Sequence, residues 1–289
     1  MNISADEFRV AEGDHVDLAD HATKIEPIYR SPTHLLELLK SHVSRLSDLQ
    51  EVLYAASSYS LLIILQGMDA AGKDSAIKHV MSGVNPQGCQ VHSFKPPSAA
   101  EREHDFLWRA ARLLPARGQI GIFNRSYYEE VLIVRVHPKM LESEGIRPEP
   151  RIQDDVWRDR YRSITEFECH LSKNNMRIVK ILLHLSKEEQ RKRFLSRIDH
   201  PAKRWKFSAD DVREREYWDR YMHAYATCLR ETSSELAPWY VVPADDKDNA
   251  HLIISQIILD TLERLKLTYP VLSTSRLAEL QSCRERLAD

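Results

Sequence analysis

Several features that would define a protein class are scarce or missing in this 289-residue sequence. No apolar run approaches the ~20 residues that cross a bilayer, and the first residues lack the basic start and apolar core of a signal peptide. Only 4 cysteines are present, and their wide spacing argues against a zinc site or a disulfide framework and favours a reducing compartment. We therefore expect a cytoplasmic protein without a membrane partner, whose thiols are Cys89, Cys169, Cys228 and Cys283.

An excess of charge of one sign is also missing. The 41 basic and 43 acidic side chains give a net charge of -2, so the whole protein has no electrostatic attraction to nucleic acid, and any anion-binding site must be local. Hydrophobic residues make up 43% and charged residues 29% of the chain, as is typical of a soluble globular protein. The length allows one elaborated domain or two small ones.

Glycine is scarce, but two of the 8 glycines lie within the most informative stretch, residues 61–80. An apolar run from Leu61 to Leu65 is typical of a strand covered on both faces, and a helical pattern follows Lys73. The glycines and Lys73 fit G-x-x-x-x-G-K, in which backbone N–H groups and the lysine surround a phosphate at a helix N-terminus. A turn that merely needs glycine is the alternative. The predicted phosphate-binding residues here are Gly67, Ala70, Ala71, Gly72, Lys73, Asp74 and Ser75.

Two aspartates make this loop unusual. Asp74 stands where a Ser or Thr normally follows the lysine and holds Mg²⁺, and Ser75 comes one position later. A carboxylate inside an anion-binding loop is costly unless a cation lies between the two charges, so Asp69 predicts a metal-bridged phosphate. A loop-capping role for Asp69 is the alternative.

Apolar runs and capping signals predict alternating strands and helices along the chain. Such alternation predicts a three-layer α/β/α fold with a five-stranded parallel sheet. We expect an N-terminal arm over residues 1–30, a phosphate-binding domain over 31–267 and a helical tail over 268–289, with an exposed excursion at 138–151. Strands are predicted at 61–65, 89–94, 119–123, 178–185 and 239–242. Helices are predicted at 31–56, 98–114, 154–171, 186–197, 208–229 and 249–265. Three of these helices begin with a capping pair: Ser98 with Glu101, Ser186 with Glu189, and Ser208 with Asp211.

A second polar cluster follows the predicted strand at 119–123. In open α/β sheets ligands bind beyond the carboxyl ends of the strands, so residues 124–130 lie beside the phosphate loop if the two strands are neighbours. Arg125 could then clamp a phosphate, and Glu129 or Glu130 could share a metal. A capping arrangement at a helix start explains the same residues equally well. On the helix at 98–114, one face carries His104, Asp105, Trp108 and Arg109, which is more typical of a solvated face.

Positive charge is concentrated between Lys187 and Lys206. Eight cationic side chains stand against three acidic ones in this segment, whereas the whole chain is slightly acidic. A solvated helix face would mix the two signs more evenly. The segment therefore predicts an anion-binding lid over approximately residues 187–215.

These motifs together resemble the second family of polyphosphate kinases. The resemblance runs from about Thr33 to Leu265 and rests on LQGMDAAGKD (65–74), HVMSGVNPQG (79–88), SFKPPS (93–98), HDFLWR (104–109), IFNRSYYEEV (122–131), KRWKF (203–207) and APWYVVPAD (237–245). It implies a P-loop kinase fold with a helical lid, and Mg²⁺-dependent phosphoryl transfer between inorganic polyphosphate and nucleoside mono- or diphosphates. A loop aspartate, here Asp69, is consistent with that family. We also expect a homo-oligomer, whose size the sequence leaves open.

The resemblance and the residues together predict specific roles. Lys73 and the loop amides would hold phosphates, Asp69 and Glu129 would hold Mg²⁺, and Arg125 would neutralise charge with Asn124 positioning the reactants. Phosphate or nucleotide contacts are also expected from Lys95 and Arg109, and polyphosphate contacts from Arg197, Lys203, Arg204 and Lys206. Two other functions would use the same phosphate loop. One is an ATP-dependent small-molecule kinase, which does not need the lid cations. The other is a non-catalytic polyphosphate or nucleotide sensor, which binds without turnover.

Overall fold

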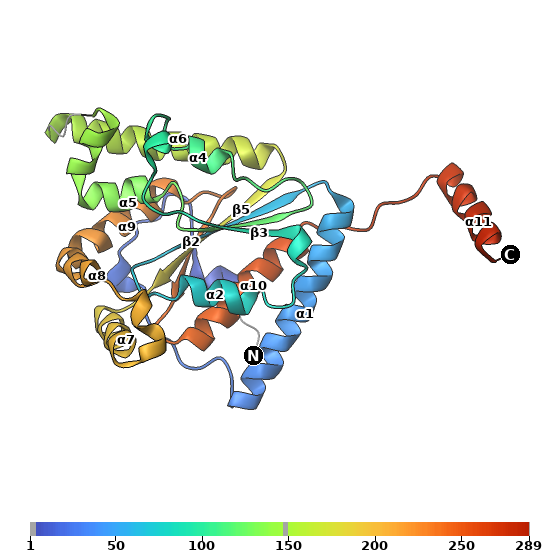
Figure 1. The fold of residues 1–289 in the computed structure, drawn as a ribbon, viewed down its shortest axis with the longest axis horizontal. Helices are drawn as coiled ribbons and strands as arrows, with labels where there is room; N and C mark the ends of the chain where they lie inside the picture. The colour runs from blue at the N-terminus through green and yellow to red at the C-terminus, as the bar shows by residue number, and fades with distance from the viewer. Residues whose placement is uncertain (1–3, 147–149, 289) are drawn as a thin grey trace.

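The computed structural model describes residues 4–146 and 150–288. Its centre is a six-stranded sheet in the order β1-β6-β5-β2-β4-β3 (Figure 1). The neighbours from β6 to β3 run parallel, as predicted for strands that alternate with helices. The strands are β1 (Arg9–Val10), β2 (Ser60–Gln66), β3 (Cys89–Ser93), β4 (Ile120–Asn124), β5 (Met176–His184) and β6 (Trp239–Pro243).

The sixth strand, β1, was not predicted and pairs antiparallel with β6 at the edge of the sheet. The prediction of a five-stranded, wholly parallel sheet is therefore wrong in one respect, because the sheet has this sixth, antiparallel strand. The segment that carries β1 packs on the domain, with Val10, Val16 and Leu18 buried in its core. A two-residue strand is too short to show any periodicity, which is why the sequence pattern did not predict it.

Helices cover both faces of the sheet (Figure 1). On one face α1, α2 and α10 pack together, and on the other α5, α6 and α9 do. The helices are α1 (Pro32–Ala56), α2 (Lys73–Val80), α3 (Ala99–Arg102), α4 (Trp108–Ala111), α5 (Glu129–Val136), α6 (Pro150–Lys173), α7 (Lys187–Asp199), α8 (Ala209–Glu214), α9 (Trp218–Thr232), α10 (Lys247–Arg264) and α11 (Thr274–Ala288).

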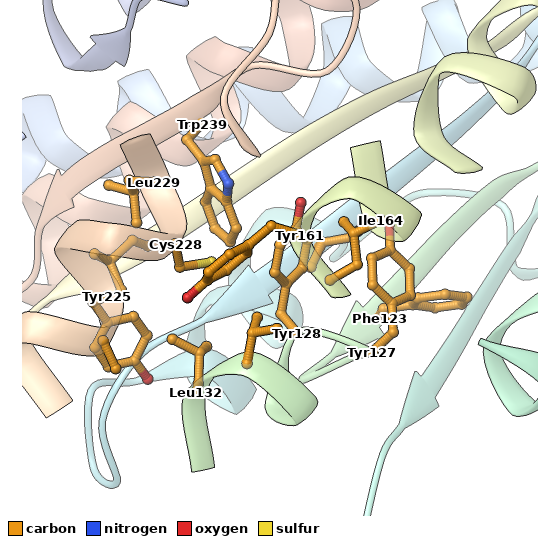
Figure 2. Close-up of a cluster of buried hydrophobic side chains, with 14 of the residues drawn as sticks. Phe123, Tyr127, Tyr128, Leu132, Tyr161, Ile164, Tyr225, Cys228, Leu229 and Trp239 are labelled. Carbon is orange, nitrogen blue, oxygen red and sulfur yellow. The ribbon is translucent and has the colours of Figure 1, made fainter. Parts of the chain in front are cut away.

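The central strand β2 divides its side chains between two cores. Leu62 and Ile64 face the α5-α6-α9 side, whereas Leu61, Ile63 and Leu65 face the α1-α2-α10 side, and all five are buried. Successive side chains of a strand point to opposite faces, so a strand covered on both faces needs an unbroken apolar run. The first of these cores is rich in aromatic rings, among them Tyr128, Tyr161, Tyr225 and Trp239 (Figure 2).

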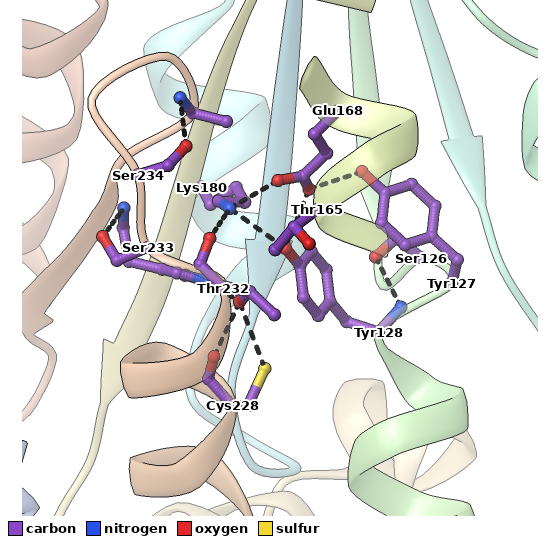
Figure 3. A network of polar contacts seen from close by, with 12 residues as sticks. Ser126, Tyr127, Tyr128, Thr165, Glu168, Lys180, Cys228, Thr232, Ser233 and Ser234 are labelled. Atoms are coloured by element: carbon purple, nitrogen blue, oxygen red, sulfur yellow. Dashed lines mark hydrogen bonds and ion pairs between the residues drawn. The ribbon is translucent and has the colours of Figure 1, made fainter. Parts of the chain in front are cut away.

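A buried ion pair lies within this aromatic layer. The Lys180 Nζ donates to Glu168 Oε2 at 2.6 Å and to the Thr232 carbonyl at 2.6 Å, and the hydroxyls of Tyr127 and Tyr128 each donate to Glu168 Oε1 at 2.8 Å (Figure 3). Burial lowers the pKa of Lys180, and the Glu168 carboxylate opposes that shift. Because every charge here has hydrogen-bonded partners, the network fixes the chain directly after Arg125.

Two predicted helices are broken in the structure. The helix expected over 98–114 divides into α3 and α4, because Asp105 Oδ1 accepts the Leu107 N–H at 2.9 Å in a local turn that competes with helical bonding. The capping box of Ser98 and Glu101 is confirmed. The helix expected over 208–229 divides into α8 and α9 at a 3₁₀ turn, Arg215–Tyr217.

Two further expectations need correction. Ser186 caps α7, but its own N–H donates to Asp245 and the Glu189 side chain pairs with Arg193, so the reciprocal half of that capping box is missing. The excursion expected at 138–151 includes a 3₁₀ helix, Pro138–Glu144, with Leu141 fully buried, so this part is not simply exposed. Residues 147–149 of that excursion lie outside the described part of the chain.

The C-terminal helix α11 projects away from the rest of the molecule (Figure 1), and all its described residues are exposed. Within residues 4–146 and 150–288, no helix is both long enough and apolar enough to cross a membrane.

Candidate active site

The phosphate loop connects β2 to α2 through a tightly constrained backbone. Gly67 has a φ of 149°, and a Cβ atom there would lie 2.9 Å from the Leu183 carbonyl oxygen, so a side chain does not fit. Gly72, at a φ of 111°, stands directly before the first residue of α2. The predicted strand, loop and helix are thus all present, and the loop's glycines are required by its geometry.

Lys73 is buried in this loop. Its Nζ donates to the carbonyl of Gly67 at 2.6 Å and to that of Met68 at 3.3 Å. Burial and the nearby Arg125 lower the pKa of Lys73 to about 8, although the carboxylates of Asp69 and Glu129 act in the opposite direction. The loop therefore holds a cation whose charge is poorly solvated and would be stabilised by an incoming anion.

Arg125 joins the loop to the end of β4. Strands β2 and β4 are parallel neighbours, which is the condition under which residues 124–130 were predicted to lie beside the phosphate loop. The guanidinium donates from Nη2 to Asp69 Oδ1 at 2.5 Å and from Nη1 to Glu129 Oε2 at 3.0 Å. Its φ of 64° is uncommon for a residue with a side chain, so the surroundings must hold this conformation in place.

The sheet edge carries a second polar contact. Asn124 Nδ2 donates to Asp74 Oδ1 at 2.7 Å, so the aspartate that replaces the usual hydroxyl is bonded to the neighbouring strand end. This contact and the pair of Arg125 with Asp69 connect the two sequence clusters that were predicted separately.

These residues line a cavity of about 820 Å³, which we call the phosphate-loop groove. The loop from Asp69 to Ser75 forms one side of it, and α7 and the following segment form another. The cationic side chains on its walls are Lys73, Arg125, Lys192, Arg193, Arg197, Lys203, Lys206 and Lys247. Burial, together with the cations Arg193 and Lys203, lowers the pKa of Lys247.

Comparison with known proteins identifies this arrangement. The family model described as Polyphosphate kinase 2 matches residues 34–269, more than half of the chain. The chain belongs to the polyphosphate kinase 2 family. It is a phosphotransferase that acts on polyphosphate and nucleotides.

Individual family members resemble most or nearly all of the chain. An ADP-polyphosphate phosphotransferase of Rhodopseudomonas palustris is 59% identical over 99% of both chains. An AMP/ADP-polyphosphate phosphotransferase of Meiothermus ruber is 46% identical over 81% of this chain and 84% of its own. The crystal structure of polyphosphate kinase 2 from Arthrobacter aurescens superposes with a TM-score of 0.85 at 40% identity, covering 97% of this chain and 96% of the other.

Most, but not all, of the predicted site residues meet in this polyphosphate kinase 2 groove. Glu129 reaches it through its ion pair with Arg125, and Gly67 begins the loop behind it. Glu130, the alternative to Glu129, instead pairs with the buried Arg160. The predicted residues that line the groove are Asp69, Ala70, Ala71, Gly72, Lys73, Asp74, Ser75, Asn124, Arg125, Arg197, Lys203 and Lys206.

Besides Gly67 and Glu129, three predicted residues do not line the groove. Arg109 is buried, donates to the Lys95 carbonyl at 2.8 Å and lies 3.8 Å from Glu130, which is the geometry of an internal brace. Lys95 is exposed beside it. Arg204 donates from Nε to the Ile198 carbonyl at 2.8 Å, within the basic segment 187–206 that was predicted to be a lid. Their contacts with substrate stay predictions.

The buried position of Arg193 was not predicted from the sequence. Arg193 counted as one of many lid charges, yet its side chain is buried and donates to the carbonyls of Ala70 and Ala71 at 3.0 and 2.9 Å. It also donates to the carbonyls of Ala244 and Asp245 at 2.6 and 3.0 Å. Arg193 thus ties the phosphate loop to the segment after β6, a contact between distant parts of the chain that no local pattern reveals.

Arg193→Met is expected to lower the free energy of unfolding by about 2–4 kcal/mol, because four carbonyl oxygens lose their charged donor. It should also lower the turnover number at least about tenfold, because the loop loses its support. Arg193→Lys should rescue little, since a single ammonium cannot span both carbonyl pairs. Urea unfolding and steady-state kinetics measure the two effects.

The matched control is Arg191→Met on the same helix. Arg191 is exposed and, among the residues that the structure describes, pairs only with Glu188 one turn away, so its replacement should change stability by less than about 0.5 kcal/mol. Equal effects of the two substitutions would show that Arg193 does not hold the loop.

A second cavity, also of about 820 Å³, lies between the N-terminal segment, the end of β5 and α9. Its lining includes His21, His184 and Trp218 but no residue of the phosphate loop. We therefore assign the phosphoryl-transfer chemistry to the phosphate-loop groove.

Proposed function

We propose that this polyphosphate kinase 2 transfers phosphoryl groups between inorganic polyphosphate and ADP in a reaction that depends on Mg²⁺. The observation that carries the proposal is the single groove in which the phosphate loop and Arg125 face the lid cations. The ADP preference is supported by the relative that is 59% identical and named an ADP-polyphosphate phosphotransferase. AMP is the second acceptor to test, because another relative is named for both nucleotides.

The geometry suits phosphoryl transfer because that reaction needs mainly alignment and neutralisation of charge. Lys73 and the loop amides would hold the phosphates that flank the transferred group. Arg125, fixed on both sides by carboxylates, would face the charge that develops on that group. Lys192, Arg197, Lys203 and Lys206 would hold the polyphosphate chain along the predicted lid.

The residues present also fit Mg²⁺. Asp69 and Glu129 bracket one guanidinium, so two carboxylates lie at the mouth of the phosphate loop. Within the described residues, no group of three or more His, Cys, Asp or Glu side chains could hold a metal. Mg²⁺ is commonly bound through one or two carboxylates together with substrate phosphates, which matches this pair. When bound, the ion would neutralise phosphate charge, and we assign its protein ligands to Asp69 and Glu129.

A direct assay tests the function. Purified protein is incubated with polyphosphate, Mg²⁺ and either ADP or AMP, and we expect ATP from ADP at the higher rate. Turnover that requires ATP and a small-molecule acceptor, with none from polyphosphate, would instead indicate an ordinary kinase. Binding of polyphosphate without any product would indicate a sensor.

Salt should separate the binding of the two substrates. A polyphosphate chain carries about one negative charge per phosphate, so it should release counterions from the groove cations as a nucleic-acid backbone does. Its apparent affinity should fall steeply with salt, whereas ADP affinity should fall gently. Lys203→Ala should reduce the polyphosphate slope of log K against log salt by about 0.7 and leave the ADP slope unchanged. Binding titrations at several salt concentrations measure both slopes.

Arg191→Ala is the control for this experiment, because Arg191 lies on α7 and is exposed but does not line the groove. Its salt slopes should stay close to those of the original protein. Equal slopes for polyphosphate and ADP, or a Lys203→Ala variant that loses both ligands alike, would place the polyphosphate site elsewhere.

The lowered pKa of Lys73 predicts a dependence on pH. In the free protein this side chain loses its proton as the pH rises through about 8, whereas a bound polyanion favours the charged form. The affinity for polyphosphate should therefore be highest below pH 8 and should fall above it. In Lys73→Arg the guanidinium stays charged, so the fall near pH 8 should be smaller, and only the contribution of the other groove lysines should remain. Titrations between pH 7 and 10 test this, and identical profiles for both proteins would contradict it.

We also propose that the chain forms a homo-oligomer. The support is α11, whose Leu277, Leu280 and Leu287 are 54%, 42% and 88% exposed on a helix that projects from the domain (Figure 1). The molar mass in solution tests this proposal.

A further inference from the structure

Ser75 lines the phosphate-loop groove one position beyond the place where such loops usually carry a hydroxyl. The usual place is taken by Asp74, whose carboxylate accepts a hydrogen bond from Asn124. A carboxylate has no proton to donate when ionised, so it cannot replace a hydroxyl as a donor to phosphate. Ser75 is therefore the hydroxyl in the loop and first turn of α2 that could do so.

A histidine from the far end of the sequence contacts this hydroxyl. His251 lies in α10 with 4% of its surface exposed, and its Nε2 is 3.2 Å from Ser75 Oγ. Its ring stacks on His79 of α2 with centroids 4.7 Å apart. The other ring nitrogen, Nδ1, is buried and has no hydrogen-bond partner in the described part of the chain.

These surroundings determine the direction of the hydrogen bond. Burial and His79 lower the pKa of His251 to about 4, so the ring is neutral and carries one proton. A proton on Nδ1 would be a buried donor without an acceptor, which is the costlier arrangement. A proton on Nε2 is donated to Ser75 Oγ, and the hydroxyl proton of Ser75 is then left for another acceptor.

We propose that His251 is a positioning residue that presents the Ser75 hydroxyl as a hydrogen-bond donor to a phosphate oxygen in the groove. His251 accepts nothing from Ser75, so the serine proton is available to the ligand when it arrives. The inference rests on the proposed function, in which the groove holds the phosphates of polyphosphate and nucleotide. It gives Ser75, already a predicted phosphate contact, the specific role of hydroxyl donor, and it adds His251, a residue outside every motif quoted from the sequence.

The test uses the full chain with Mg²⁺, polyphosphate and ADP, and compares Ser75→Ala, His251→Phe and the double variant. We expect kcat/KM to fall about tenfold in Ser75→Ala and about threefold to tenfold in His251→Phe. The double variant should be no worse than Ser75→Ala alone, because His251 acts only through that hydroxyl. His251→Gln, whose amide can donate in place of Nε2, should recover most of the loss.

Ser82→Ala is the matched control, because Ser82 directly follows the same helix and, within the described residues, its hydroxyl donates only to the His79 carbonyl. It should leave kcat/KM unchanged. If His251→Phe costs as much without the Ser75 hydroxyl as with it, or if His251→Gln is as impaired as His251→Phe, the role is structural and the proposal fails. An original protein that makes no ATP from polyphosphate would instead overturn the proposed function itself.

Discussion

Lys73→Ala is expected to lower the turnover number for phosphoryl transfer at least ~100-fold while the fold stays intact. Lys73 supplies the only side-chain cation between Gly67 and Lys73, and the loop carbonyls hold its ammonium in place at 2.6 and 3.3 Å. A preorganised donor of this kind faces charge that develops in the transition state, and its loss typically costs about 2.7–4 kcal/mol. Steady-state kinetics with polyphosphate and ADP measure the change, and circular dichroism checks the fold.

Lys78→Ala provides the control. Lys78 lies on the same helix but is exposed and does not line the groove, so its replacement should leave the turnover number nearly unchanged. Near-normal activity of Lys73→Ala would remove the phosphate loop from the reaction.

The part of the site that could be predicted from the sequence depends on local rules. Gly67 and Lys73 belong to one short motif whose backbone geometry is nearly independent of the rest of the chain. The meeting of Arg125 with Asp69 required one further rule, that ligand-binding residues gather at the carboxyl ends of neighbouring parallel strands. The register of β2 with β4 confirms that step.

The rest depends on contacts between segments far apart in the sequence. Lys247 lies at the start of α10 and reaches the groove only because β6 lies beside β5. Arg193 and Arg204 are both basic residues of the lid segment, yet one is buried under the loop and the other bonds within its own segment. Charge alone cannot separate them, because the sequence does not state which side of α7 faces the loop.

The short elements escaped prediction for a related reason. Strand β1 is two residues long, and the break between α3 and α4 depends on one aspartate side chain that bonds to a neighbouring N–H. Periodicity needs several residues to become visible, so features of this size are set by tertiary packing and by single hydrogen bonds.

Asp69→Asn is expected to remove most of the activity and to raise the Mg²⁺ concentration needed for half-maximal turnover at least about tenfold. The substitution keeps the size of the side chain but removes the charge that a hard cation requires. Asp69 accepts from the Arg125 guanidinium at 2.5 Å, so its carboxylate lies in an ion pair beside the phosphate loop. Magnesium titrations of the rate, at saturating ADP and polyphosphate, measure the shift.

The comparison with Asp74→Asn sharpens this result. That substitution also removes one negative charge from the loop region, at a carboxylate bonded to Asn124 and not to Arg125. It should leave the Mg²⁺ requirement within about twofold of the original value, because Asp74 is not among the proposed ligands. If Asp69→Asn loses activity while its Mg²⁺ titration stays unchanged, Asp69 acts only by holding Arg125, and the metal must be bound by other groups. A tenfold shift in Asp69→Asn alone would assign the metal to the carboxylate inside the loop and not to Asp74, the residue that stands in place of the usual hydroxyl.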